Sequence, residues 1–164
     1  MNAAIITVSD KGSRGERVDT AGPAIKEMLL TINCETVEYL IVPDERDIIG
    51  NAIKEMASKG INLIFTTGGT GFSKRDVTPE ATLDVIEREI PGIPEAMRYN
   101  SMKITPKGML SRSRAGIIGD SIVVNLPGSE KAVRENLATI LPVIGHGVSI
   151  LLGTKTECGV PYKK

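Results

Sequence analysis

Tryptophan is absent from the 164-residue sequence, which contains only two phenylalanines and three tyrosines. So few aromatic side chains disfavour a surface on which nucleic-acid bases stack. The 20 lysine and arginine residues are balanced by 20 aspartate and glutamate residues, and no block of like charge occurs. Since nucleic-acid-binding domains usually carry a basic excess or a basic face, we expect no nucleic-acid partner.

Cysteine and histidine are also scarce. Cys34 and Cys158 are too few and too far apart for a zinc motif or a disulfide framework, so free thiols in a reducing cytosol are predicted. The only histidine, His146, lies in an apolar segment, where a packed structural histidine is the favoured interpretation. Without an HExxH motif or a histidine cluster, proteolytic, esterase and zinc chemistry have little support.

The sequence has no long uninterrupted hydrophobic run. Its most apolar tract, residues 137–152, is broken by Pro142 and His146 and is too short to cross a bilayer. The first residues, MNAAIITVSDKG, lack the charged region and cleavage site of a signal peptide. We therefore expect a cytoplasmic protein without a membrane partner, and the length predicts one domain over residues 1–164.

Strand and helix patterns alternate along the first half of the chain. Apolar strands are predicted at residues 3–8, 36–42 and 63–65. Helices are predicted at residues 21–32, from residue 45 onward until Gly60 ends the helix, and at residues 79–89. The second half predicts a helix at 95–103, two strands at 116–119 and 121–126 that meet in a tight turn at Gly119-Asp120, and a last helix capped by Ser129. The predicted fold class is α/β: a three-layer sandwich with a mostly parallel sheet, helices on both faces and an antiparallel edge hairpin.

Three polar loops follow the three predicted parallel strands. They are Ser9–Gly22, Pro43-Asp44 and Gly68–Thr78. Ligands of such folds bind beyond the carboxyl ends of the strands, so we expect these loops to converge on a ligand.

The third loop opens with Gly68-Gly69-Thr70-Gly71, where glycines permit positive φ and close approach to a ligand. Lys74, Arg75 and Asp76 follow, and Thr78-Pro79 is typical of a helix N-cap and first turn. This order of residues suits phosphate binding. It matches neither GxGxxG nor GxxxxGK[ST], so a tight connection without a ligand remains an alternative.

Asp44 and Asp76 are the candidate catalytic residues and Mg²⁺ ligands. Each has a structural alternative, Asp44 as a helix N-cap and Asp76 as a turn residue. Together they suit Mg²⁺, which needs only one or two carboxylates besides substrate phosphates. Phosphoryl and nucleotidyl transfer depend mainly on positioning and charge neutralisation, so the lack of a usable histidine is consistent with such chemistry.

The cations best placed for phosphate are Lys74, Arg75, Arg112 and Arg114, although a solvated surface position remains the alternative for each. With Ser111 and Ser113 between them, they predict more than one anion pocket.

Several segments in this order resemble the molybdopterin adenylyltransferases, the Mog/MoaB-like family. The segments are TTGGTG followed by RDVTPEAT, GIPEAMR, MLSRSRAG and VVNLPGS, and the resemblance runs over nearly the whole chain. It implies Mg²⁺-ATP-dependent transfer of AMP to the terminal phosphate of molybdopterin with release of pyrophosphate, by a homotrimer. The alternatives are a non-catalytic molybdopterin-binding carrier or scaffold and a general nucleotide or phosphosugar binder.

The resemblance also implies roles for individual residues. Asp76 corresponds to the essential acidic residue and Asp44 to its partner in the cleft. The implied substrate-binding residues are Gly68, Gly69, Thr70, Gly71, Thr78, Ser111, Arg112, Gly128 and Ser129. Two positions depart from the family pattern: Lys11 replaces the usual arginine, and Glu130 stands where proline is frequent.

Overall fold

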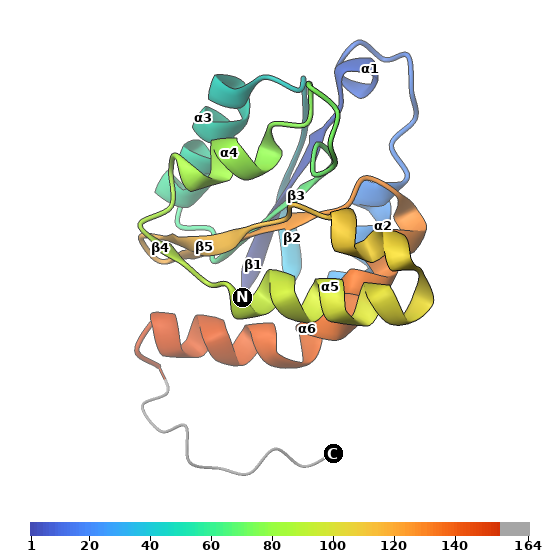
Figure 1. Ribbon diagram of the computed structural model, residues 1–164. Coiled ribbons are helices and arrows are strands. Elements are labelled where there is room, and N and C mark those ends of the chain that lie inside the picture. The colour runs from blue at the N-terminus through green and yellow to red at the C-terminus, as the bar shows by residue number, and fades with distance from the viewer. Residues whose placement is uncertain (155–164) are drawn as a thin grey trace.

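A six-stranded sheet with the strand order β2-β1-β3-β6-β5-β4 forms the middle layer of the computed structural model, which describes residues 1–154 (Figure 1). Four strands are parallel: β1 (Asn2–Val8), β2 (Glu35–Val42), β3 (Leu63–Thr67) and β6 (Ser121–Leu126). Strand β5 (Ala115–Ile118) is antiparallel to both of its neighbours, β6 and the edge strand β4 (Arg88–Glu89). Gly119, with φ of +52°, turns the chain between β5 and β6, so the predicted fold class and its edge hairpin are confirmed.

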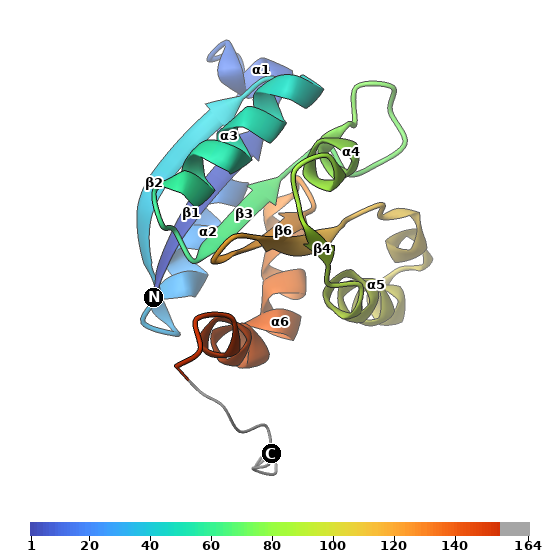
Figure 2. The same cartoon turned by 90° about the vertical axis from the view of Figure 1, so that its left-hand side faces the viewer.

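Helices cover both faces of the sheet. On one face, α6 (Glu130–Leu151) packs against α2 (Ala21–Leu30) and α5 (Gly92–Ile104) (Figure 2). On the other, α3 (Arg46–Ser58) packs against α4 (Thr78–Leu83). Two short elements, α1 (Asp10–Ser13) and the 3₁₀ helix η1 (Pro106–Leu110), lie in the connections.

Side chains of the central strands alternate between two hydrophobic cores. Ile5 and Phe65 enter the core under α2 and α6, whereas Ile6 and Ile64 enter the core under α3 and α4. All are fully buried, because strands covered on both faces have no solvent side. This arrangement explains the uninterrupted apolar runs at residues 3–6 of β1 and 63–65 of β3.

The predicted helix at residues 79–89 is too long. Helix α4 ends at Leu83, and the chain then turns to pair with β5, where Glu87 N donates to Ile117 O (2.7 Å) and Ile90 N to Ala115 O (2.8 Å). The side chain of Ile86 lies against Gly116, where an added Cβ would collide with it. Pairing with the sheet thus overrides the local helical pattern.

Asn125 on β6 joins several elements inside the protein. Its fully buried side chain donates from Nδ2 to Thr66 Oγ1 (2.9 Å) and Thr82 Oγ1 (2.8 Å). Its Oδ1 accepts from Arg114 N (3.1 Å). These bonds connect β6 to β3, to α4 and to the segment that enters β5.

The scarce residues have different surroundings. Cys34 is a free, buried thiol whose pKa is raised by burial, whereas Cys158 and the rest of residues 155–164 of the predicted domain lie outside the described residues. His146 is exposed on α6, so the prediction of a packed histidine is wrong. Within residues 1–154, no helix has the length and apolar character needed to span a membrane.

Candidate active site

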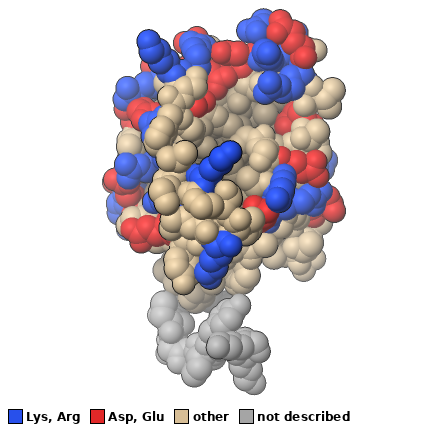
Figure 3. All heavy atoms as spheres, turned by 45° about the vertical axis from the view of Figure 1, so that its right-hand side comes forward, with Lys and Arg blue, Asp and Glu red and all other residues tan. Residues whose placement is uncertain are grey.

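The three predicted loops converge on a cavity of about 370 Å³ beyond the carboxyl ends of the parallel strands. Figure 3 shows the surface hollowed below a rim on which acidic and basic side chains alternate. Strand β1 separates β2 from β3, so the loops that carry Asp44 and Asp76 flank the loop after β1. The lining residues are Thr7, Val8, Ser9, Gly12, Arg17, Val18, Asp19, Thr20, Asp44, Thr67, Gly68, Gly69, Asp76, Gly128 and Ser129.

Two glycines of the third loop have conformations that other residues rarely adopt. Gly68 has φ of +102°, and an added Cβ would collide with the carbonyl oxygen of Val8. Gly69 has φ of +63°, and an added Cβ would collide with Thr78 Oγ1 and lie 3.3 Å from Asp44 Oδ1. The glycines therefore bring backbone, rather than side chains, to the wall of the cavity.

Gly128 and Ser129 complete this wall from the end of β6. The position of an added Cβ on Gly128 is 3.2 Å from Gly68 Cα, so the two loops approach backbone to backbone. Ser129 is the N-cap of α6, as predicted, and its Oγ accepts from Ala132 N (3.3 Å). The N-terminus of a 22-residue helix thus adjoins the cavity.

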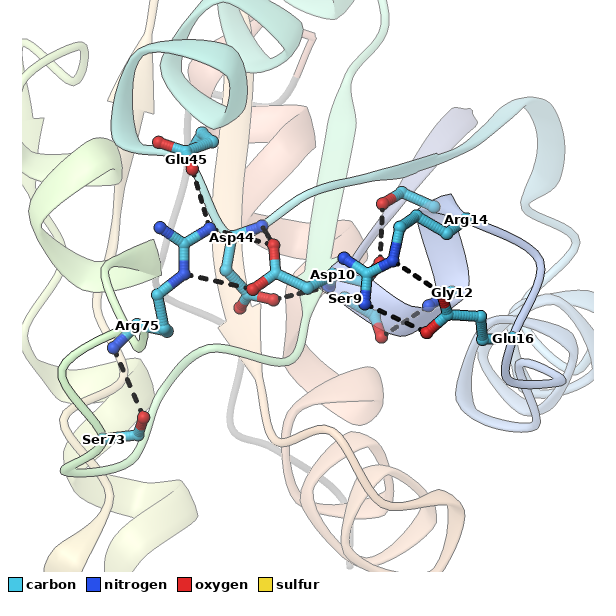
Figure 4. A network of polar contacts seen from close by, with 10 residues as sticks. Ser9, Asp10, Gly12, Arg14, Glu16, Asp44, Glu45, Ser73 and Arg75 are labelled. Atoms are coloured by element: carbon cyan, nitrogen blue, oxygen red, sulfur yellow. Dashed lines mark hydrogen bonds and ion pairs between the residues drawn. The ribbon is translucent and has the colours of Figure 1, made fainter.

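Asp44 is held by the loop after β1 and does not cap α3. The N-cap of α3 is Glu45, so the N-cap interpretation of Asp44 is wrong. Asp44 Oδ2 accepts from Asp10 N (2.7 Å), and Asp44 N donates to Asp10 Oδ1 (3.1 Å) (Figure 4). The carboxylate is therefore fixed at the cavity wall by a neighbouring loop.

Asp76 combines a turn role with a place in the cavity. Its Oδ2 accepts from Ser73 N (2.8 Å) and its N–H donates to Ser73 O (3.0 Å), as expected of a turn residue. The pKa of Asp44 is raised, first by burial and then by the charges of Asp10 and Asp76. The two cavity carboxylates thus repel each other, and a bound cation would relieve this repulsion.

Mg²⁺ fits this pair. No cluster of three or more His, Cys, Asp or Glu side chains suitable for a metal occurs in the described part of the chain. A site of two carboxylates nevertheless suffices for Mg²⁺ when substrate phosphates and water supply the other ligands.

Arg75 is paired and joins the three loops. Its Nε and Nη2 donate to the two carboxylate oxygens of Asp10 (3.0 and 2.9 Å), and Nη2 also donates to Glu45 Oε1 (2.7 Å) (Figure 4). These hydrogen bonds raise the pKa of Arg75 and, with that from Asp44 N, lower the pKa of Asp10. The guanidinium therefore holds the loops that carry Asp44 and Asp76 together.

Sequence reasoning missed Asp19, which lines the same cavity. Its Oδ2 accepts from the hydroxyls of Thr7 and Tyr39, and its Oδ1 accepts from Ala21 N (2.9 Å) and Gly22 N (3.1 Å) at the start of α2. Burial alone would raise the pKa of Asp19, but these four hydrogen bonds outweigh it and lower that pKa. Burial and Asp19 together raise the pKa of Tyr39 to about 12. An aspartate just before Ala21-Gly22-Pro23 is the sequence signal of this cap.

Ser111 and Arg112 lie at a second cavity, of about 270 Å³. Arg112 joins this cavity to the glycine loop, because its N–H donates to Thr70 O (3.0 Å) and its Nε to Gly71 O (2.7 Å). Its guanidinium also contacts the Glu80 carboxylate and the Asp76 carbonyl. The lining residues of this cavity are Pro79, Glu80, Leu83, Arg98, Ser111, Arg112, Ser113 and Arg114.

Three of the predicted site residues line neither of these cavities. Thr70 is buried, and the carbonyls of Thr70 and Gly71 accept from Arg112. Thr78 is the first residue of α4 and not its predicted N-cap, which is Val77; its Oγ1 donates to Gly68 O (2.9 Å). These three residues therefore support the glycine loop through hydrogen bonds without lining either cavity.

The fold and this rim define a class: α/β domains whose ligands bind beyond the carboxyl ends of parallel strands. A family model described as a probable molybdopterin binding domain matches residues 4–146. The chain therefore belongs to the molybdopterin-binding domain family.

Individual relatives agree with this assignment. The chain is 41% identical over 152 residues to the molybdopterin adenylyltransferase of Helicobacter pylori strain J99, covering 91% of this chain and 86% of that protein. The crystal structure of the molybdopterin biosynthesis enzyme MoaB from Thermus thermophilus superposes with a TM-score of 0.88 at 46% identity, covering 93% and 96% of the two chains. Gephyrin of Dictyostelium discoideum is 42% identical over 168 residues, but this chain spans only 23% of its length.

Proposed function

We propose that this protein transfers AMP from Mg²⁺-ATP to the terminal phosphate of molybdopterin and releases pyrophosphate, a step of molybdenum cofactor biosynthesis. The main support is that Asp44 and Asp76, from the loops after β2 and β3, face one cavity whose wall is glycine backbone. The names of the relatives, which include several molybdopterin adenylyltransferases, agree with it.

In the proposed reaction, an oxygen of the molybdopterin phosphate attacks the α-phosphorus of ATP. The bond from that phosphorus to the bridging oxygen breaks, and pyrophosphate leaves with the electron pair. A phosphate monoester is already largely ionised at neutral pH, so the attacking oxygen needs no protein base. This agrees with the position of His146, which lies on α6 and lines neither cavity.

The residues of the first cavity position the reacting groups. Asp44 and Asp76 would hold Mg²⁺, which neutralises charge on the phosphates when it is bound. Backbone groups at Gly68 and Gly69, together with the α6 N-terminus at Gly128-Ser129, accommodate phosphate without side-chain obstruction. We assign Ser111 and Arg112 to substrate at the second cavity, with Thr70, Gly71 and Thr78 as support for the loop between them.

Release of pyrophosphate on mixing the protein, ATP, Mg²⁺ and molybdopterin tests this proposal. Wild type should release pyrophosphate only when molybdopterin is present, and Asp76→Asn should abolish the release. Molybdopterin binding without any release by wild type would identify a carrier or scaffold instead. Tight binding of ATP without Mg²⁺ and without molybdopterin would favour a general nucleotide binder.

A homotrimer and a cytoplasmic location, expected from the resemblance and the sequence respectively, belong to the same proposal. Sedimentation equilibrium tests the first, because a trimer has three times the mass of the 17.5 kDa chain.

A further inference from the structure

Arg17 is the only lysine or arginine among the residues that line the first cavity. It lies in the segment between α1 and α2. Within residues 1–154, it makes no ion pair and its side chain forms no hydrogen bond. Arg75 and Arg112, which lie close by in the fold, are instead occupied by Asp10, Glu45 and Glu80. The cavity thus contains one cation that is not already neutralised.

The segment that carries Arg17 is fixed at both ends. Arg14 pairs with Glu16 (Nε to Oε1, 2.8 Å), and Glu16 N donates to Lys11 O (2.8 Å). Two residues after Arg17, Asp19 binds the hydroxyls of Thr7 on β1 and Tyr39 on β2 and caps α2. The backbone before Arg17 is therefore held by α1 and the backbone after it by the sheet, and Arg17 between them lines the cavity.

The charge balance of the cavity shows what such a cation is suited to bind. A Mg²⁺ ion held by Asp44 and Asp76 would balance the two carboxylates and leave the charge of a polyphosphate unopposed. Asp19 adds a third carboxylate to the lining, although its oxygens are occupied by four hydrogen bonds. The guanidinium is planar and permanently charged, and it binds phosphate oxygens in a bidentate manner.

We propose that Arg17 binds the pyrophosphate portion of the nucleoside triphosphate, the group that leaves in the reaction. This inference rests on the proposed function for its substrate, but it makes a separate claim about which residue holds the leaving group. Arg17 is then a specificity residue for polyphosphate over monophosphate ligands.

Binding of inorganic pyrophosphate at a fixed excess of Mg²⁺, measured by isothermal titration calorimetry, tests the assignment without turnover. Arg17→Gln should weaken binding about ten-fold or more, the effect of losing one hydrogen-bonded charge, and Arg17→Lys should restore part of it. Arg14→Gln is the matched control, because Arg14 lies in the same segment but pairs with Glu16 outside the cavity lining. Thermal unfolding should be the same for the three variants, since both arginines are exposed.

Equal affinities of wild type and Arg17→Gln, equal losses in Arg17→Gln and Arg14→Gln, or no pyrophosphate binding by wild type would each overturn the inference. The result is separable from the proposed function. Pyrophosphate binding that depends on Arg17 in a protein that transfers no AMP supports this inference and refutes the activity. AMP transfer with an unchanged KM for ATP in Arg17→Gln supports the activity and refutes the inference.

Discussion

Asp10 and Asp44 exchange two hydrogen bonds, each accepting on its carboxylate the backbone N–H of the other. The exchange occupies Oδ2 of Asp44 and leaves Oδ1 on the side of Gly69. The Asp10 carboxylate in turn accepts hydrogen bonds from Nε and Nη2 of Arg75. The orientation of one cavity carboxylate is thus set by the loops after β1 and β3 as well as by its own.

Asp44→Asn should remove activity and increase stability at neutral pH. Burial and neighbouring charges raise the pKa of Asp44 in the folded protein. The folded protein therefore binds this proton more tightly than the unfolded chain does. Wild type loses stability as the pH rises from about 4, the pKa of aspartate in the unfolded chain, through the raised pKa of the folded protein. The asparagine side chain does not ionise, so the variant avoids this loss of stability, and its amide oxygen can still accept from Asp10 N.

Thermal unfolding of both proteins between pH 3 and pH 8 measures the difference. The difference in unfolding temperature should be largest at the alkaline end of this range and should vanish near pH 3. Each kcal/mol of added stability in the variant should raise the unfolding temperature by about 2–4 °C. A variant less stable than wild type at pH 8 would contradict this account of Asp44.

Arg75→Gln should slow the reaction much more than it destabilises the fold. Exposed ion pairs contribute about 0–1 kcal/mol, so unfolding should change little. Misplacement of Asp44 and Asp76 relative to each other should lower kcat roughly ten- to hundred-fold. Arg46→Gln is the control, because it removes a similar exposed pair, with Asp84, that joins no cavity loop. Equal kcat values for the two variants would show that the Arg75 pairs do not position the site.

Gly69→Ala should destabilise the protein by more than the same change at Gly15. Both residues have positive φ, which costs a non-glycine residue roughly 1–2 kcal/mol. At Gly15 an added Cβ meets nothing within 4 Å, whereas at Gly69 it collides with Thr78 Oγ1. Urea unfolding measures both, and only Gly69→Ala should also reduce pyrophosphate release. A smaller loss of stability at Gly69 than at Gly15 would mean that the loop moves freely.

Asn125→Ala should cost about 1–3 kcal/mol for each buried group left without a partner. The affected groups are the hydroxyls of Thr66 and Thr82 and the N–H of Arg114. Asn51→Ala on the exposed face of α3 is the control and should stay within about 0.5 kcal/mol of wild type. Similar unfolding midpoints for the two variants in urea would show that the buried network adds no net stability.

Local patterns were sufficient to predict the sheet and the convergence of the loops. Apolar strands such as Leu63–Phe65 alternate with amphipathic helices, and parallel strands place the loops that follow them at one rim. Gly68 and Gly69 were identifiable because a backbone that needs positive φ selects glycine. This topology places the loops of Asp44 and Asp76 at the same rim.

The rest depends on partners that are distant in sequence. Arg75 and Arg112 were predicted as phosphate-binding cations, but the carboxylates of Asp10 and Glu80, which are distant in sequence, pair with them. The sequence does not reveal this pairing. Arg17 and Asp19 join the cavity because of how the segment before α2 folds back on β1 and β2. Helix α4 is short because residues after Leu83 find a strand partner in β5.

That edge of the sheet has a consequence for behaviour at high concentration. Strand β4 is two residues long, and both of them, Arg88 and Glu89, are exposed and charged. Short, charged edges offer little free backbone to a second molecule and disfavour the edge-to-edge growth that leads to aggregates. The segment after Leu83, which ends α4 early and forms β4, therefore protects this edge of the sheet from pairing with a second molecule.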